Sequence, residues 1–376
     1  MSVADEIARA ELDALRARGL RRSLEPLRSP AGAEIELRPG ERLINLSSND
    51  YLGLAADARI TSALAQGAAR WGAGAGASRL VTGDFLPQHE LENELASFQG
   101  TEAALLFNSG YAANSAMVPV FAGPEDLVLS DALNHASIID ACRLSRARVE
   151  IYPHADVGAV EELLREIPAR RKLVITDSIF SMDGDRAPLR ELSQVCASAG
   201  AMLAVDEAHA TGILAPEPIG DLRMATHSKA LGVAGAHVAG SRAVCDLLIN
   251  RARPLIFSTA LPPAIACAVL KSLQIVRGPE GDDRRARLWR NVARFAEGLR
   301  NLGLPARADS PIFPFLLGTP DNALRVASKL RELGVLAKAI RPPTVPPGTS
   351  RIRFALTAAH TEQHIDSALS ALRTAC

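Results

Sequence analysis

Short apolar runs and amphipathic helical patterns alternate along most of the chain. The apolar runs are strand-like, and they lie at residues 103–107, 126–130, 149–152, 173–177, 202–205 and 236–239. Helical spacing of apolar residues fills the segments at 136–146, 158–169 and 188–199. Alternation of this kind predicts a parallel sheet with helices on both faces, which is an α/β fold.

The pattern changes towards the two ends of the chain. Residues 2–18 have the spacing and charge of an exposed amphipathic helix. After residue 281 the predicted order is helix, strand, helix, proline-rich loop, strand and helix, which indicates a smaller α+β domain. We therefore divide the chain into an N-terminal helix and segment (1–45), a large domain (46–280) and a C-terminal domain (281–376).

Composition excludes several classes of partner. The formal net charge of the 376 residues is zero, so we expect neither nucleic acid nor a membrane surface as a partner. No apolar run is long enough to span a bilayer, and the N-terminus has no signal core, so we expect a cytoplasmic protein. The five cysteines are scattered and never spaced as CxxC, which predicts free thiols and no metal site.

Polar side chains follow the predicted strands. His135, Asp177, Ser181, Asp206 and His209 all lie just after a strand. In parallel sheets, ligands bind at the carboxyl ends of the strands. The sequence therefore predicts that these side chains gather at one edge of the sheet.

An acid and a lysine define the chemistry that we expect there. Asp206 ends an apolar run, and a carboxylate facing a pyridine nitrogen keeps that nitrogen protonated. Lys229, one of only five lysines, lies among small residues and follows Thr226. An amine of this kind forms Schiff bases with aldehydes. The pair predicts a pyridoxal 5'-phosphate (PLP) site.

Other side chains have both a binding and a structural interpretation. The turn Ser109-Gly110-Tyr111 opens a helix whose free amides could hold a phosphate, although many capped helices begin in this way. His135 either stacks on a ring or caps a helix, and His209 is either a ligand or a buried histidine. Arg353 lies in Arg351-Ile352-Arg353, and we expect one of the two arginines to face inward and bind a carboxylate.

One rival interpretation concerns nucleotides. Residues 206–209 spell DEAH, a motif of nucleotide hydrolases. That function needs a Walker A loop, and the glycine-rich run 71–79 lacks its GK[ST] ending.

Nine segments together resemble the α-oxoamine synthases, which are fold-type I PLP-dependent transferases. The segments are SSNDYLGL (47–54), GAGASRLVTG (74–83), NSGYAAN (108–114), SDALNHASIIDACRLS (130–145), TDSIFSMDGD (176–185), DEAHATG (206–212), THSKALG (226–232), FSTALPP (257–263) and RIRFALTAAH (351–360). The resemblance implies a mostly parallel seven-stranded sheet flanked by helices.

The resemblance also implies roles around PLP. Lys229 forms the Schiff base and moves protons, and Asp206 pairs with the ring nitrogen. His135 stacks on the ring, while His209 and Ser181 approach the ring hydroxyl.

The phosphate and the substrates are assigned in the same way. The turn at Ser109, Gly110 and Tyr111 holds the phosphate together with Thr226. In a homodimer with shared active sites, Ser258 and Thr259 reach the phosphate of the partner subunit.

Three more residues are assigned to the substrates. Asn49 and Arg353 address the amino acid. Arg21 approaches the distal end of the acyl chain, although Arg21-Arg22 is also typical of a solvated helix end.

The implied reaction is a decarboxylative condensation of an amino acid with an acyl thioester. The segments SPIFPFLLG (310–318) and RPPTVPPGTS (341–350) resemble members that join L-alanine to a pimeloyl thioester of CoA or acyl-carrier protein. Members that use glycine or serine with acetyl, succinyl or palmitoyl groups stay open, as does an inactive binding protein on this fold. The chain departs from the family pattern in its short 213–224 segment, in Ala210 and in His227, where a smaller or apolar residue is expected.

Overall fold

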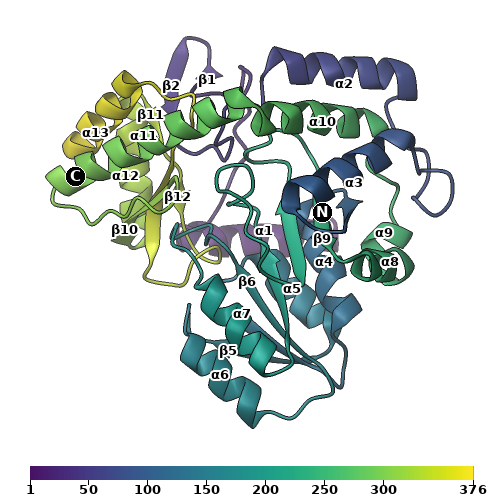
Figure 1. The fold of residues 1–376 in the computed structure, drawn as a ribbon. Coiled ribbons are helices and arrows are strands. Elements are labelled where there is room, and N and C mark those ends of the chain that lie inside the picture. Colours follow the sequence, from purple (N-terminus) through teal and green to yellow (C-terminus); the bar gives the residue numbers. More distant parts are fainter. Residues whose placement is uncertain (376) are drawn as a thin grey trace. The chain divides into compact units, whose positions relative to one another are not determined.

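The large unit contains a seven-stranded sheet with the strand order β3-β9-β8-β7-β6-β4-β5 (Figure 1). The computed structural model describes residues 1–375. The strands are β3 (Ala103–Phe107), β4 (Leu127–Asp131), β5 (Arg148–Tyr152), β6 (Lys172–Asp177), β7 (Met202–Asp206), β8 (Leu222–Thr226) and β9 (Ala236–Gly240). Only β9 is antiparallel to its neighbours among these strands, which confirms the predicted mostly parallel sheet.

Helices cover both faces of this sheet (Figure 1). One apolar core lies between the sheet and the helices α4 (Gly110–Phe121), α5 (Ala136–Ser145) and α8 (Arg242–Arg251). A second core lies on the other face, against α6 (Val157–Glu166) and α7 (Leu189–Ser198). Because parallel strands are covered on both faces, their side chains are apolar almost throughout.

The large unit comprises residues 50–181 and 185–286. It also contains helices that were not assigned from the sequence. They are α8 and α9 (Arg253–Ile256), which accompany α2 (Ala58–Trp71), α3 (Leu86–Gln99) and α10 (Pro263–Arg277). Strand β8 was not assigned either, because Arg223 interrupts its apolar pattern.

The smaller unit comprises residues 1–49, 182–184 and those from Arg287 onward. Its sheets have the orders β1-β2-β11 and β10-β13-β12. Their strands are β1 (Glu34–Arg38), β2 (Glu41–Asn45), β10 (Ile312–Gly318), β11 (Val335–Leu336), β12 (Ala339–Ile340) and β13 (Ser350–Ala355). The helices are α1 (Val3–Ala17), α12 (Pro320–Glu332), α13 (Glu362–Ala375) and most of α11 (Pro279–Asn301). The division at 45/46 and 280/281 stays a prediction.

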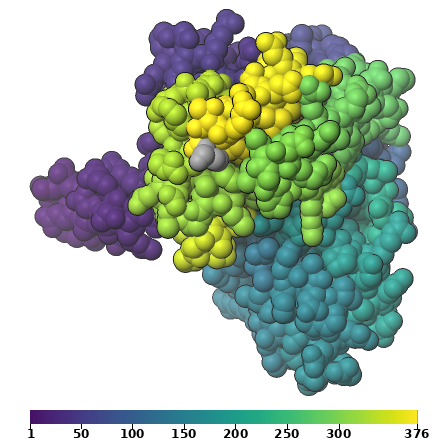
Figure 2. All heavy atoms as spheres, turned by 90° about the vertical axis from the view of Figure 1, so that its left-hand side faces the viewer, coloured from purple at the N-terminus to yellow at the C-terminus, as the bar shows by residue number. Residues whose placement is uncertain are grey.

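Helix α1 has no buried residue, and it projects from the rest of its unit in Figure 2. Its N-terminal end is nevertheless well defined, because Ser2 and Asp5 form a capping box. In the described residues no helix is long and apolar enough to cross a membrane. The four described cysteines are free thiols, and Cys376 lies outside the described residues.

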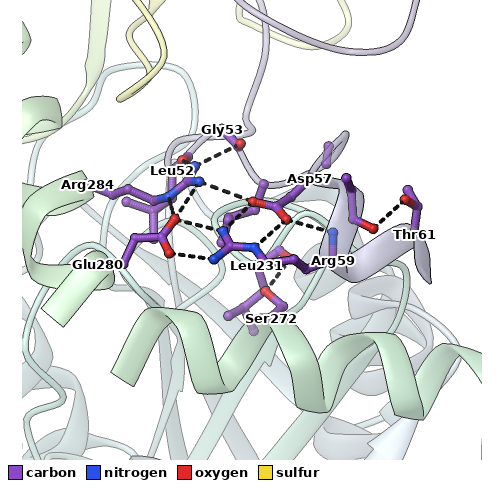
Figure 3. A network of polar contacts seen from close by, with 12 residues as sticks. Leu52, Gly53, Asp57, Arg59, Thr61, Leu231, Ser272, Glu280 and Arg284 are labelled. Carbon is purple, nitrogen blue, oxygen red and sulfur yellow. Dashed lines mark hydrogen bonds and ion pairs between the residues drawn. The ribbon is translucent and has the colours of Figure 1, made fainter. Parts of the chain in front are cut away.

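A polar network fixes the loop at residues 50–57 within the large unit (Figure 3). Arg284 Nη1 donates to the carbonyl oxygens of Leu52 at 2.8 Å and Gly53 at 3.0 Å. Its Nη2 donates to Asp57 at 3.2 Å and to Glu280 at 2.8 Å. The guanidinium therefore holds the middle and the C-terminal end of the loop that carries Tyr51.

Candidate active site

A cavity of about 160 Å³ lies at the carboxyl ends of the sheet strands in the large unit. It brings together seven residues predicted from the sequence, which are Gly110, Tyr111, His135, Asp206, His209, Thr226 and Lys229. It also contains Asp177, which the strand-end pattern placed at this edge of the sheet, and four residues that were not assigned, which are Ser137, Ala208, Met224 and Ser228. Another cavity, of about 210 Å³, includes Glu207 and Thr211, but none of its described lining residues is a lysine.

Asp206 is held in a fixed orientation at the end of β7. The residue is buried, with only 3% of its surface exposed. Asn114 Nδ2 donates to one carboxylate oxygen at 2.8 Å, and the amide of Ala208 donates to the other at 2.9 Å. Two hydrogen bonds leave each carboxylate oxygen a further lone pair for a ligand.

His135 stands at the N-terminus of α5 and faces the same cavity. Its Nδ1 accepts from the Ser137 amide at 3.2 Å, and its own amide donates to Asp177 at 2.8 Å. Burial lowers the pKa of His135, a shift that Asp206 opposes and Lys229 reinforces. The imidazole is therefore neutral near pH 7, which suits it for stacking on an aromatic ring. Burial holds the pKa of Asp177 well above its ordinary value, and the charge of Asp206 adds to this shift.

The N-terminus of α4 supplies an anion site at one end of the cavity. Ser109 is the N-cap and accepts from the amide of Ala112 at 3.2 Å. The amides of Gly110 and Tyr111, in the first turn of the helix, have no partner within the helix. Thr226 lies beside them, and its hydroxyl donates to the carbonyl of Gly235 at 3.0 Å. Free amides and the helix dipole together favour a phosphate here.

Lys229 lies in the turn between β8 and β9. The amide of Gly232 donates to the Lys229 carbonyl at 2.9 Å, and Ser272 Oγ donates to the Leu231 carbonyl at 2.7 Å (Figure 3). Gly232 has φ +67°, and a Cβ there would lie 2.5 Å from the backbone nitrogen of Ala55. The lysine turn is therefore pressed directly against the loop at 50–57.

That loop also holds His209. The hydroxyl of Tyr51 lies 2.6 Å from His209 Nδ1, so the two groups share a hydrogen bond. Tyr51 is far from His209 in sequence, and no local pattern identified it. Asn114 could have been found, because it lies four residues after Gly110 and so shares a face of α4.

The remaining predicted residues are not among those that line this cavity. Ser181 follows β6 in the loop at 178–187. Asn108 Nδ2 donates to Ser258 Oγ at 3.1 Å and to the Thr259 carbonyl at 2.9 Å, all within one chain. These contacts lie next to the N-cap of α4.

The substrate residues belong to the smaller unit. Arg353 Nη2 donates to Asn49 Oδ1 at 3.1 Å, and Arg21 is exposed. Arg351 and Arg353 are both buried, so the expectation that only one faces inward is wrong. Residues two apart in a strand point to the same side, and Arg351 pairs there with Asp183.

Known proteins similar to this chain identify its family. Residues 41–372 match the family model "Aminotransferase class I and II". An 8-amino-7-oxononanoate synthase of Anaeromyxobacter dehalogenans (strain 2CP-1 / ATCC BAA-258) is 53% identical, over 96% of this chain and 94% of that protein. One from Herminiimonas arsenicoxydans is 45% identical, over 98% and 99%. The chain belongs to the 8-amino-7-oxononanoate synthases of this aminotransferase family.

Solved structures place the same family in three dimensions. A serine palmitoyltransferase from S. paucimobilis with a bound PLP–myriocin aldimine matches with a TM-score of 0.92 and 28% identity, over 100% of this chain and 98% of that one. An 8-amino-7-oxononanoate synthase from Francisella tularensis matches with a TM-score of 0.75 and 28% identity, over 88% and 97%. The predicted fold-type I architecture is confirmed.

Family membership makes the protein an acyltransferase that uses PLP, as predicted. The cavity fits this cofactor in the chemistry of its donors. It has a buried carboxylate, a neutral imidazole, a lysine and a helix N-terminus, on Asp206, His135, Lys229 and α4.

Proposed function

We propose that the protein condenses L-alanine with a pimeloyl thioester and releases CO2, to give 8-amino-7-oxononanoate for biotin biosynthesis. The acyl donor is pimeloyl-CoA or pimeloyl-acyl-carrier protein, and the free thiol of that carrier is the third product. The observation that carries the proposal is one cavity that gathers Lys229, Asp206 and His135. It lies in a chain that is 53% identical to a synthase of this name.

PLP, when bound, supplies an electron sink for negative charge at the amino-acid α-carbon. In the proposal, Asp206 accepts a hydrogen bond from the ring nitrogen and keeps it protonated. Asn114 and Ala208 hold that carboxylate in place. Lys229 Nζ removes the α-proton from alanine and later returns a proton to the product carbon.

The other lining residues bind and orient. The neutral His135 imidazole packs on the ring face, and His209, fixed by Tyr51, donates or accepts at the ring hydroxyl together with Ser181. The amides of Gly110 and Tyr111 and the hydroxyl of Thr226 hold the phosphate.

We assign the substrates to the smaller unit. Arg353, with Asn49 beside it, binds the carboxylate of alanine, since a guanidinium fork matches a carboxylate in two places. Arg21 addresses the distal end of the acyl chain. The protein acts in the cytoplasm as a homodimer, in which Ser258 and Thr259 also reach the phosphate of the partner subunit.

The test begins with the cofactor. Purified protein incubated with PLP is expected to turn yellow, and the colour is expected to disappear in Lys229→Ala. Lys329→Ala is the matched control, because Lys329 is half exposed and pairs only with Glu332 among the described residues. A colourless wild type contradicts the proposed site.

The substrates are tested as pairs. Alanine, glycine and serine are each mixed with pimeloyl-, acetyl-, succinyl- and palmitoyl-CoA, and release of free CoA is measured. Serine and palmitoyl-CoA are included because serine palmitoyltransferase structures match the fold. Fastest release with alanine and pimeloyl-CoA supports the proposal, and faster release with any other pair contradicts it.

A further inference from the structure

Five buried polar side chains form a continuous chain of hydrogen bonds in the large unit. The members of this Arg223 network are Glu207, Arg223, Gln99, His237 and His227. Arg223 is the second residue of β8, between Leu222 and Met224. Met224 lines the PLP cavity, and neighbouring strand residues point to opposite faces. The network therefore lies on the face of the sheet turned away from the cofactor.

Arg223 is the charged centre of the network. The residue is only 1% exposed. Its Nε donates to Glu207 Oε1 at 2.9 Å, and its Nη2 donates to Gln99 Oε1 at 2.5 Å. Its Nη1 donates to the Gln99 carbonyl at 2.7 Å. A guanidinium can only donate, so the amide of Gln99 must turn its oxygen towards Arg223 and its nitrogen away.

The orientation of Gln99 fixes the protons on both histidines. Gln99 Nε2 faces His237 Nε2 at 3.5 Å, and because the amide nitrogen is a donor, the imidazole nitrogen must accept. His237 then carries its proton on Nδ1, which lies 3.0 Å from His227 Nε2. His227 Nε2 accepts a hydrogen bond from His237 Nδ1–H, so His227 carries its own proton on Nδ1.

Both imidazoles are neutral, and only a neutral imidazole has one protonated and one unprotonated ring nitrogen. Burial lowers the pKa of His227 to about 3. It also holds the pKa of His237 well below its ordinary value, helped by the nearby charge of Arg223. Glu207 is the counter-ion, and the nearby Arg223 opposes the rise that burial causes in the pKa of this carboxyl.

The two ends of the network adjoin the two chemical groups of the site. Glu207 follows Asp206 directly, and its amide donates to the Met224 carbonyl at 2.7 Å. His227 lies two residues before Lys229. Its amide donates to the Gly235 carbonyl at 2.9 Å, and its carbonyl accepts from the Val233 amide at 3.0 Å, both across the lysine turn.

The His227 ring itself packs against the end of the lysine turn. A Cβ at Gly235, where φ is +111°, would lie 3.0 Å from His227 Nδ1. The Nδ1 atom makes no hydrogen bond of good geometry to a described residue, and the backbone of Ala234 gives it a weaker contact. Moving the proton of His227 from one ring nitrogen to the other would therefore change the contacts of the turn that carries Lys229.

We propose that the Arg223 network is a positioning device that sets the lysine turn relative to Asp206 through a single tautomer of each histidine. Arg223 selects the amide orientation of Gln99, and the two imidazoles transmit that choice to the turn. The consequence for catalysis rests on the proposed function.

The first experiment reads the tautomers directly. The apoprotein is labelled with ¹⁵N-histidine and studied by ¹⁵N NMR, and the signals are assigned with the variants His227→Leu and His237→Leu. Both rings are expected to be protonated on Nδ1. Gln99→Glu replaces the amide by an isosteric carboxylate that can only accept, beside the Arg223 cation. His237 Nε2 must then donate, so both rings are expected to change to the Nε2–H tautomer. Unchanged tautomers in this variant contradict the proposal.

The second experiment asks whether the turn responds. In Gln99→Glu, kcat is expected to fall about tenfold while the KM for alanine stays within about twofold, because Lys229 is displaced without loss of a substrate contact. The absorbance band of bound PLP is expected to shift as well, a readout that needs no substrate. The control is Gln194→Glu, at an exposed position of α7, which is expected to leave both unchanged.

The outcomes separate this proposal from the proposed function. Tautomers that reverse while the PLP band and kcat stay the same contradict positioning. If no substrate pair reacts, the histidine tautomers and the absorbance band of bound PLP still show whether the Arg223 network positions the lysine turn. If Gln99→Glu does not fold, Gln99→Met removes the donor to His237, and a mixture of tautomers is then expected in place of one. A single Nδ1–H tautomer in that variant refutes the role of Gln99.

Discussion

Replacing Arg284 by methionine tests whether the loop at 50–57 supports the cofactor site. The side chain is 15% exposed and donates to the carbonyls of Leu52 and Gly53, to Asp57 and to Glu280. Leu52 is fully buried, so its carbonyl has no ready access to water. A buried acceptor left unsatisfied costs about 1–3 kcal/mol.

The total effect is smaller than the sum of four contacts. Arg59 still bonds both Asp57 and Glu280, so the two carboxylates keep a cationic partner. Gly53 is partly exposed, and water can replace its donor. We therefore expect Arg284→Met to lower the free energy of unfolding by about 2–3 kcal/mol, most of it from the Leu52 carbonyl.

The assay is urea unfolding of the apoprotein, followed by titration with PLP. Weaker PLP binding is expected too, because the same loop carries Tyr51 and backs the lysine turn. Arg290→Met, at an exposed position of the same helix α11, is the control and is expected to change stability by less than about 0.5 kcal/mol. An Arg284→Met variant as stable as this control would refute the argument.

Three further changes test other contacts. Glu207→Gln leaves the buried Arg223 without a counter-ion, and we expect urea unfolding to show a loss of about 3–5 kcal/mol, most of it restored when Arg223→Met accompanies Glu207→Leu. Tyr51→Phe removes the hydrogen bond to His209, and a loss of about 0.5–1.5 kcal/mol in PLP affinity is expected by titration. Hydrogen bonds from Arg59 lower the pKa of Asp57 from 3.8 to about 2, so its contribution to stability is present above pH 3.8 and is lost as the pH falls through about 2. The melting temperature of Asp57→Asn should therefore depend less on pH in that range than that of the wild type; equal slopes would contradict the assignment.

The sheet was predictable because most of its parallel strands contain a run of apolar residues. Strand β8 was missed, since its second residue is a charged and fully buried arginine. A buried charge is tolerated only where it is paired, and the partners of Arg223 lie on α3 and after β7. Pairing of that kind depends on tertiary contacts, which periodicity does not contain.

The candidate site divides in the same way. Lys229, Asp206 and His135 were predictable because strand ends and family motifs mark them. Tyr51 was not assigned, because its role comes from a hydrogen bond across 158 positions of the chain. Asn114 bonds Asp206 across 92 positions, but its place on the same face of α4 as Gly110 could have identified it. The expectation that only one of Arg351 and Arg353 faces inward was wrong because residues two apart in a strand point to the same side.

The contact between Gly232 and Ala55 has a consequence for the order in which the protein matures on the ribosome. The lysine turn rests on residues 50–57, which are synthesised long before it, and on Ser272, which is synthesised after it. A nascent chain that has emerged only as far as Lys229 therefore has the first support and lacks the second. We expect the amine to become competent to capture PLP only after α10 has left the exit tunnel, so cofactor loading belongs to a late stage of synthesis.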